Sequence, residues 1–327
     1  MNMRLTVFLF IVFGLSQIVK AQDPHFSQFY ANPLYLNPAF AGSEKCPRAT
    51  LNYRNQWPAL GSTYVTYSAA YDQHVDWLEG GVGLNLINDA QGDGAINTFY
   101  ANLMYAYTFR VNRKFYLKGG FEASYIYKTL NWDYVFPDML HPLYGAIYPT
   151  QEDYVPTDLN KGYFDFSLGL LGYTGSHYFG LAVHHLTEPP ESYRDNSDAV
   201  LPRKWTLHYG TKIPIRVRGF KKGEIFLSPN IIYERQRDFE QFNYGLYFSR
   251  KSIVGGFWLR QNFKFQYDSF IMLLGYIKDN YRFSYSYDLT ISRLRNATLG
   301  SHEVSVGYIF ACRNKKPKFR AISCPSF

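Results

Sequence analysis

The most constraining feature of this sequence is a period-two alternation of apolar and polar residues that recurs along most of its length. In residues 281–289 (YRFSYSYDL), Tyr, Phe and Leu occupy one set of alternate positions, while Arg, Ser and Asp occupy the other. Successive side chains of a β-strand point to opposite faces, so each such stretch predicts a strand with one apolar and one polar face. The predicted strands are 48–57, 62–73, 80–89, 96–110, 114–129, 162–173, 177–186, 203–214, 223–236, 239–249, 252–262, 267–278, 281–291 and 301–311.

The length of these strands and the lengths of their connections indicate a membrane barrel. Strands of soluble sandwiches usually run to about five or six residues, whereas a tilted membrane strand needs about 9–11. If the strands alternate in direction, the three longest connections, 130–161, 187–202 and 292–300, fall on one side, and those on the other side are short. Long outer loops and short periplasmic turns are typical of outer-membrane barrels. We therefore predict an all-β transmembrane barrel of about fourteen antiparallel strands, with a soluble β-sandwich as the alternative.

The composition agrees with this fold class. Aromatic residues make up 19% of the chain and charged residues only 18%, a mixture that strands with one lipid face and one polar face produce. After the first 21 residues no segment approaches 18 continuous apolar residues, which excludes helical membrane spans.

The N-terminus has the features of an export signal. Arg4 precedes the apolar run 5–15, and the segment ends with a small residue at Ala21. A signal peptidase cleaves after this pattern. Export makes cytoplasmic and nucleic-acid functions improbable, and we expect no nucleic-acid partner. The predicted division is a signal peptide (1–21), an N-terminal periplasmic or plug segment (22–47), the barrel (48–311) and a basic periplasmic tail (312–327), with both termini periplasmic.

The polar faces of the strands carry charges of both signs. A barrel of fourteen strands is too wide for side chains alone to fill, so either something occupies the lumen or it conducts. These charges therefore either line water or form a salt-bridge network. The predicted lumen charges are Arg54, Lys118, Glu122, Glu234, Arg260, Arg282 and Asp288.

The sequence offers little catalytic or metal-binding chemistry. No catalytic residue can be assigned, because no recognisable nucleophile or metalloprotease motif is present. The pair His184-His185 does not suggest a metal site, since adjacent strand residues point to opposite faces and one histidine is expected on each side of the wall. We predict no enzymatic activity, no cofactor and no bound metal.

Three smaller features leave alternatives open. The loop 137–149 is apolar for a surface loop, and either folds inward as a partial plug, presents an apolar patch to a partner, or packs on itself. The basic tail docks an acidic partner, lies against anionic outer-membrane lipid, or stays solvated. Of the three cysteines, Cys312 and Cys324 could close a small loop in an oxidising compartment, with Cys46 on the same side.

The segment after the predicted cleavage site reads QDPHFSQFYANPLYLNPAFAG, and lacks charge after Asp23. Apolar side chains at positions 26, 29, 30, 33 and 34 would form one stripe of a short helix, and the two Asn-Pro pairs would end it and turn the chain. We expect a short turn or helix at the periplasmic mouth or inside it. Candidate partner-binding residues are Phe26, Gln28, Phe29, Tyr30, Asn32, Pro33, Asn37, Pro38 and Phe40.

This segment, with its DPHFSQFY and NPAFAG motifs, resembles the amino-terminal signature of the PorP/SprF family. The resemblance continues through the alternating strands to the last one, SHEVSVGY at 301–308, while the tail after Phe310 is an extension. It implies a non-enzymatic outer-membrane barrel of the type IX secretion and gliding-motility machinery of Bacteroidetes-type bacteria. The expected partners are the C-terminal domains of secreted adhesins and lipoprotein subunits of the periplasmic secretion ring. The alternative is a porin-like channel for small solutes.

Overall fold

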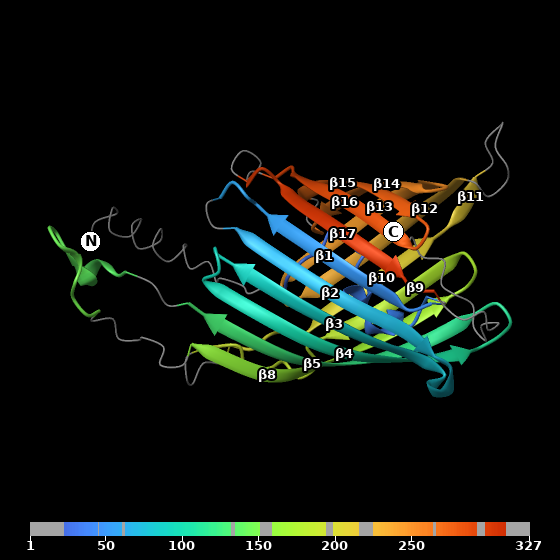
Figure 1. Cartoon of the computed structure of the whole chain (residues 1–327), viewed down its shortest axis with the longest axis horizontal. Helices are drawn as coiled ribbons and strands as arrows, with labels where there is room; N and C mark the ends of the chain where they lie inside the picture. Colours follow the sequence, from blue (N-terminus) through green and yellow to red (C-terminus); the bar gives the residue numbers. More distant parts are fainter. Residues whose placement is uncertain are drawn as a thin grey trace, which may run out of the picture.

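The computed structural model describes residues 23–44, 46–60, 63–131, 135–150, 159–193, 199–215, 225–263, 266–292 and 298–311. Within them, long antiparallel strands form one sheet that closes on itself (Figure 1). The closed ring contains fourteen strands, so the predicted fold class is confirmed. The predicted signal peptide and the tail from residue 312 lie outside the described residues.

The barrel strands match the predicted segments closely. They are β1 (Arg48–Gln56), β2 (Tyr64–Val75), β3 (Gly80–Gln91), β4 (Ile96–Arg110), β5 (Tyr116–Leu130), β8 (Asn160–Tyr173), β9 (His177–His184), β10 (Lys204–Thr211), β12 (Ile225–Gln236), β13 (Phe239–Arg250), β14 (Ile253–Gln261), β15 (Tyr267–Lys278), β16 (Tyr281–Thr290) and β17 (Ser301–Ile309).

Two seams close the ring. β1 pairs with β17, with Arg48 opposite Ile309, and β10 pairs with β12, with Lys204 opposite Gln236. The second ladder continues in the short strand β11 (Ile213–Ile215), which pairs with the start of β12. Pro229 lies in β12 at the point between these two pairings. Proline has no backbone N–H to donate to a ladder, which accounts for a break at this point.

The two ends of the barrel differ. The end at which β1 begins and β17 ends, here called the tail rim, has short connections, including 174–176, 251–252 and 279–280. The opposite end, here called the loop rim, bears the connections 131–159, 185–203 and 291–300. In Figure 1 the arrowhead of β1 points to the loop rim, at the left, and that of β17 to the tail rim.

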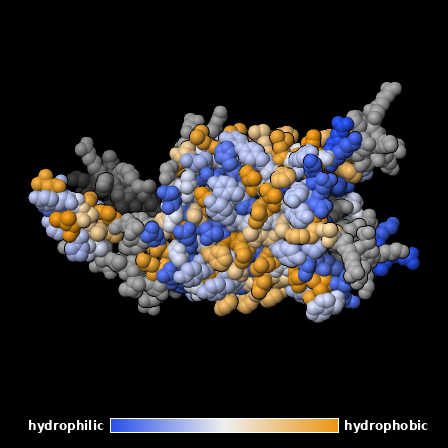
Figure 2. Space-filling model, viewed as in Figure 1, coloured by the Kyte–Doolittle hydropathy of each residue, from blue (hydrophilic) through white to orange (hydrophobic). Residues whose placement is uncertain are grey.

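The outer flank of the barrel is apolar. Leu51, Leu103, Phe164 and Leu274 each expose more than half of their surface, at positions that alternate with buried lumen residues. Figure 2 shows apolar side chains over the middle of the flank and hydrophilic ones toward the right-hand end. A folded domain in water would not leave such a band exposed, and lipid is its natural solvent.

The remaining elements are short. They are α2 (Pro33–Leu36) and the 3-10 helices η1 (Pro38–Phe40), η2 (Asp76–Leu78) and η3 (Pro137–Met139). None of the helices in the described ranges is long and apolar enough to cross a membrane. Strands β6 (Leu140–His141) and β7 (Gly145–Ala146) form a small hairpin beyond the loop rim. Its Leu143 and Tyr144 are 82% and 73% exposed, so the apolar loop points into solvent and does not fold inward.

Candidate functional site: a plug in the barrel lumen

Residues 23–44, here called the plug, run through the lumen of the barrel. At one end Asp23 contacts His185, directly after β9, and at the other end Gly42 contacts Asp72 near the end of β2. Between them most side chains are buried, including Ser27, Gln28, Ala39 and Phe40, each at 0% exposure. The plug therefore crosses from the loop rim to the tail rim.

Two Asn-Pro pairs shape the plug. Pro33 begins α2 and Pro38 begins η1, since a proline at the first helical position has no N–H that would need a partner. The Asn37 side chain accepts a hydrogen bond from the backbone N–H of Ala39 (2.9 Å) and so caps η1. The predicted apolar stripe of one helix from residue 26 is wrong, because residues 26–32 form bends and turns.

The direction of the plug corrects a prediction about the chain ends. Asp23 lies at the loop rim, whereas β17 ends at the tail rim. The start of the described chain and its end at Ala311 are thus at opposite ends of the barrel, so the expected placement of both ends on one side fails for the described residues. Sequence reasoning missed this because a segment preceding the first strand can either stop at the mouth or traverse the lumen.

Aromatic packing holds the apolar side of the plug. The ring of Phe29 lies 4.8 Å from that of Trp258, centroid to centroid, and the ring of Tyr30 lies 5.7 Å from that of Tyr178. Phe40 stacks on His208 at 5.4 Å. The Tyr30–Tyr178 pair is edge-on and the Phe40–His208 pair is stacked, and aromatic pairs in such geometries add about 0.5–1.5 kcal/mol to the burial of their surfaces.

Four buried charges meet the plug near the loop rim. This central ion cluster consists of Arg54, Arg260, Asp288 and Glu303. Arg54 pairs with Asp288 (3.1 Å) and with Glu303 (3.2 Å), and Arg260 pairs with Asp288 (3.4 Å). Two cations face two anions, so the cluster is neutral. Buried charges need such pairing because desolvation is costly.

The plug completes the hydrogen bonds of this cluster. The Ser27 hydroxyl accepts from Arg54 (2.6 Å) and Arg260 (3.1 Å) and donates to Asp288. The backbone N–H groups of Ser27 and Gln28 donate to the Glu303 carboxylate at 2.7 and 3.2 Å. A hydroxyl and two amides of the plug therefore satisfy charges that belong to the barrel wall.

A second set of contacts holds the plug at the tail rim. Lys118 donates to the Ala41 carbonyl (2.6 Å), and the Gly42 N–H donates to Asp72 (2.9 Å). Asp72 also accepts from Arg48 at 2.8 Å, and Arg282 pairs with Glu44 at 3.3 Å. Charged side chains of four different strands thus converge on the last residues of the plug.

Glycines in the wall let the plug approach the strands. A Cβ atom at Gly120 of β5 would lie 2.4 Å from the Ala39 nitrogen, and one at Gly81 of β3 would lie 2.1 Å from the Ala41 oxygen. Both distances are far inside van der Waals contact. No other residue fits at either position without moving the plug or the wall.

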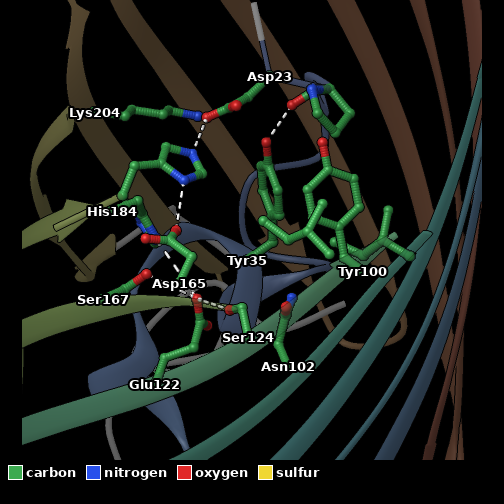
Figure 3. Close-up of a pocket in the computed structure, with 14 residues that line it drawn as sticks. Asp23, Tyr35, Tyr100, Asn102, Glu122, Ser124, Asp165, Ser167, His184 and Lys204 are labelled. Carbon is green, nitrogen blue, oxygen red and sulfur yellow. Dashed lines mark hydrogen bonds and ion pairs between the residues drawn. The ribbon is translucent and has the colours of Figure 1, made fainter. Parts of the chain in front are cut away.

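The start of the plug is latched at the loop rim. The imidazole of His185 lies between the carboxylates of Asp23 and Asp165, and Figure 3 shows Lys204 next to Asp23. His185 Nε2 bonds to Asp23 at 2.9 Å and its Nδ1 to Asp165 at 2.7 Å. A protonated imidazole donates both of these hydrogen bonds at once. The adjoining cavity is about 40 Å³, room for a few water molecules.

The group of Asp23, His185 and Asp165, here called the latch, sets the protonation state of His185. Burial alone would lower the pKa of this imidazole, but the charges and hydrogen bonds of Asp23 and Asp165 raise the pKa to about 10. His185 is therefore an imidazolium at neutral pH, and its charge compensates one of the two carboxylates it bridges.

The structure corrects the prediction for His184-His185. Strand β9 ends at His184, and His185 has a left-handed backbone with φ +58°. The alternation of faces stops there, and both histidines line the cavity beside the plug. His184 lies 3.9 Å from Glu122. In the described part of the chain, no group of three or more potential ligands could hold a metal ion.

The possible disulfide between Cys312 and Cys324 falls on residues outside the described ranges, so it stays a prediction. Cys46, which lies within those ranges, is disulfide-bonded.

The partner-binding and lumen-charge candidates from the sequence all lie in or around the lumen. The partner-binding candidates Phe26, Gln28, Phe29, Tyr30, Asn32, Pro33, Asn37, Pro38 and Phe40 are all buried. Three of the lumen-charge candidates contact Ser27: Arg54, Arg260 and Asp288. Lys118 contacts Ala41, and Arg282 contacts Glu44. Glu122 lies near His184, and Glu234 lies near Lys204.

Sequence reasoning missed several lumen residues. Glu303 alternates with Ser301 and Ser305 on the polar face of β17, so its position was readable from the pattern. Trp258 breaks the pattern, because it is a large apolar side chain that faces the lumen at 1% exposure. The inward position of Trp258 is explained by its packing against Phe29 of the plug, a contact that the strand pattern does not reveal.

The fold and the site together define a class of protein: an outer-membrane-type β-barrel whose lumen is occupied by its own N-terminal segment. A family model described as type IX secretion system membrane protein PorP/SprF matches residues 18–308. The chain belongs to this family, as its N-terminal motifs predict.

Solved structures agree on the fold. The toluene transporter TbuX of Ralstonia pickettii aligns with a TM-score of 0.50 and 9% identity, over 85% of this chain and 93% of TbuX. The toluene transporter TodX of P. putida also gives 0.50, with 11% identity and the same coverages. A comparison with curated proteins finds no match. At these identities the likeness shows the barrel fold alone.

The central ion cluster yields a stability prediction. Glu303→Gln leaves Arg54 and Arg260 with one carboxylate between them, so we expect a loss of about 3–5 kcal/mol in the free energy of unfolding. Asp268→Asn is the matched control, because Asp268 approaches the same Arg260 at 3.9 Å with a side chain that is 58% exposed, and should cost under about 1 kcal/mol. Urea unfolding in lipid vesicles measures both; equal losses would contradict a buried role for Glu303.

The glycine contacts yield a conductance prediction. Gly120→Val forces the plug away from β5, and we expect it to produce an ion current in planar bilayers that the parent protein lacks. Gly119→Val is the control, because a Cβ there meets nothing within 4 Å. A Gly120→Val barrel that remains as tightly sealed as the Gly119→Val barrel would contradict the expectation that the close approach of the plug to β5 keeps the lumen closed.

The latch yields a pH prediction. The pKa of His185 is raised from 6.5 to about 10, so its stabilising effect is complete below about pH 6.5 and is lost as the pH rises through about 10. Relative to His185→Gln, the parent should be more stable by about 1.5–3 kcal/mol at pH 6 and no more stable at pH 11. Urea unfolding across this range measures the difference. His177→Gln, at the tail rim, should not reproduce the profile, and a pH-independent difference for His185→Gln would refute the latch.

Proposed function

We propose that this chain is a non-enzymatic outer-membrane barrel that serves type IX secretion by binding other proteins and not by conducting solutes. It would assist the export or surface anchoring of adhesin-type cargo through the cargo's C-terminal domain, and contact the periplasmic secretion ring. One observation carries the proposal: the plug runs through the lumen and is hydrogen-bonded to the wall at Asp23, Ser27, Ala41 and Gly42, from one rim to the other.

The plug weighs against the porin alternative. A porin needs a continuous water-filled path, and here buried aromatic and amide groups occupy the middle of the barrel. The cavity beside the latch is about 40 Å³, too small for a sugar or amino acid. Conduction would require the plug to leave and its contacts with the central ion cluster to break.

The distribution of loops supports an orientation. Long connections gather at the loop rim and short ones at the tail rim, which favours an extracellular loop rim and a periplasmic tail rim. In that orientation Asp23 is latched near the cell surface, and Cys46, the start of β1 and the end of β17 face the periplasm.

The burial of the plug bears on how partners bind. The candidates around Phe26 and Phe40 are not accessible while the plug is seated, so a partner could reach them only after plug release. The exposed alternative is the apolar hairpin around Leu143 and Tyr144. An exposed apolar patch of this kind is a candidate protein contact, and in the proposed orientation it faces cargo at the cell surface.

Capture experiments test this function. Tagged full-length chain, solubilised from native outer membranes, should recover an adhesin-type C-terminal domain or a periplasmic ring subunit, identified by mass spectrometry. Deletion of residues 23–42 should allow barrel assembly, because the strand ladders do not involve the plug, but abolish capture. Failure of the full-length chain to recover any secretion component, together with a large steady current in planar bilayers, would favour the porin alternative.

A further inference from the structure

A pocket on the outside of the wall has no role in the plug. It lies at the loop rim beside the seam of β10 and β12, with a volume of about 490 Å³. Its lining contains three arginines and one glutamate, together with apolar and aromatic side chains. These residues are Glu188, Val200, Pro202, Arg203, Trp205, Arg235 and Arg237; the set is called the arginine pocket.

The strand register places the arginine pocket on the membrane side of the wall. Trp205 stands opposite Arg235 in the β10–β12 ladder. Their neighbours Lys204, Thr206, Glu234 and Gln236 are buried in the lumen, so Trp205 and Arg235 point outward. Trp205 is 46% exposed. Tryptophan at the end of a membrane strand is typical of the level of the lipid headgroups.

Apolar wall extends from the pocket into the hydrocarbon region. Leu207 follows Trp205 on the outer face of β10, and Ile231 lies on the outer face of the paired strand β12; they are 52% and 43% exposed. A molecule whose charged end sits in the pocket can therefore lay acyl chains along these strands. A soluble anion would leave this wall unused.

The arginines are available for an anion. Arg203 pairs with Glu188 at 3.5 Å and Arg235 with Glu240 at 3.6 Å, with side chains that are 49% and 57% exposed. Ion pairs that exposed are worth about 1 kcal/mol or less, so a stronger acceptor can replace the carboxylates. Arg237 has no ion pair with any carboxylate in the described ranges, and it stands at the β12–β13 turn with φ +55°.

We infer that the arginine pocket binds the phosphate group of a lipid in the leaflet at the loop rim, with the acyl chains lying against Leu207 and Ile231. Guanidinium groups match phosphate oxygens bidentately, and three of them around one pocket favour a multiply charged phosphate over a carboxylate. The inference uses the barrel fold and the outward orientation of Trp205. In the proposed orientation the lipid is a phosphorylated glycolipid of the outer leaflet, and the secretion role is not needed.

Lipid binding by the full-length chain in detergent micelles tests this site without any assumption about orientation. The probes are a bis-phosphorylated glycolipid (lipid A), its dephosphorylated form and inorganic phosphate, with retention measured by native mass spectrometry. We expect the phosphorylated lipid to be retained, and retention to fall by about tenfold or more in R203Q/R237Q. That expectation corresponds to the loss of one charged hydrogen bond or more.

The matched control is R110Q/R113Q, which removes two exposed arginines near the tail rim and should retain the phosphorylated lipid as the parent does. Equal retention by R203Q/R237Q and the parent would overturn the inference, as would equal retention of the dephosphorylated lipid by the parent. Displacement of the lipid by equimolar inorganic phosphate would assign the pocket to a soluble anion instead. Because none of these outcomes involves a secretion partner, the result is independent of the capture experiment.

Discussion

The contact between the plug and the central ion cluster is the interaction on which the interior of this barrel depends. Arg54, Arg260, Asp288 and Glu303 compensate one another in charge, but their remaining hydrogen-bonding capacity is met by Ser27 and Gln28. Without the plug, water would have to take its place, because a lumen of this width is not filled by wall side chains. The polar interior and the N-terminal segment are therefore one structural unit.

Much of the barrel was predictable from the sequence because its cause is local. Alternation such as that in 281–289 follows from a wall with lipid on one side and a polar lumen on the other, and it set both the strands and their number. The same reasoning placed Arg54, Lys118 and Asp288 inside. It also showed that something must occupy the lumen or that the lumen conducts, without deciding between them.

What escaped sequence reasoning depends on pairings between distant segments. Trp258 faces the lumen although lumen residues are usually polar, because it packs on Phe29, which belongs to the plug and not to a barrel strand. His185 turns inward because one residue with a left-handed backbone ends the alternation after β9. The direction of the plug depends on which of its ends binds at the loop rim and which at the tail rim. Composition and periodicity do not determine these contacts.

The contacts along the plug are unequal, and this limits how it could be displaced. At the loop rim, Asp23 is held mainly by His185, a single side chain that bridges two carboxylates. At the tail rim, residues 39–44 are held by Lys118, Asp72 and Arg282 and by backbone packed against glycines, and the chain continues directly into β1. A ligand arriving at the loop rim has one latch to open before it meets the central ion cluster. A ligand arriving at the tail rim must break the densest contacts first, and it cannot detach the plug from β1. Release that starts at the loop rim would therefore break fewer contacts at the outset than release that starts at the tail rim, so the latch is where displacement of the plug would cost the least energy.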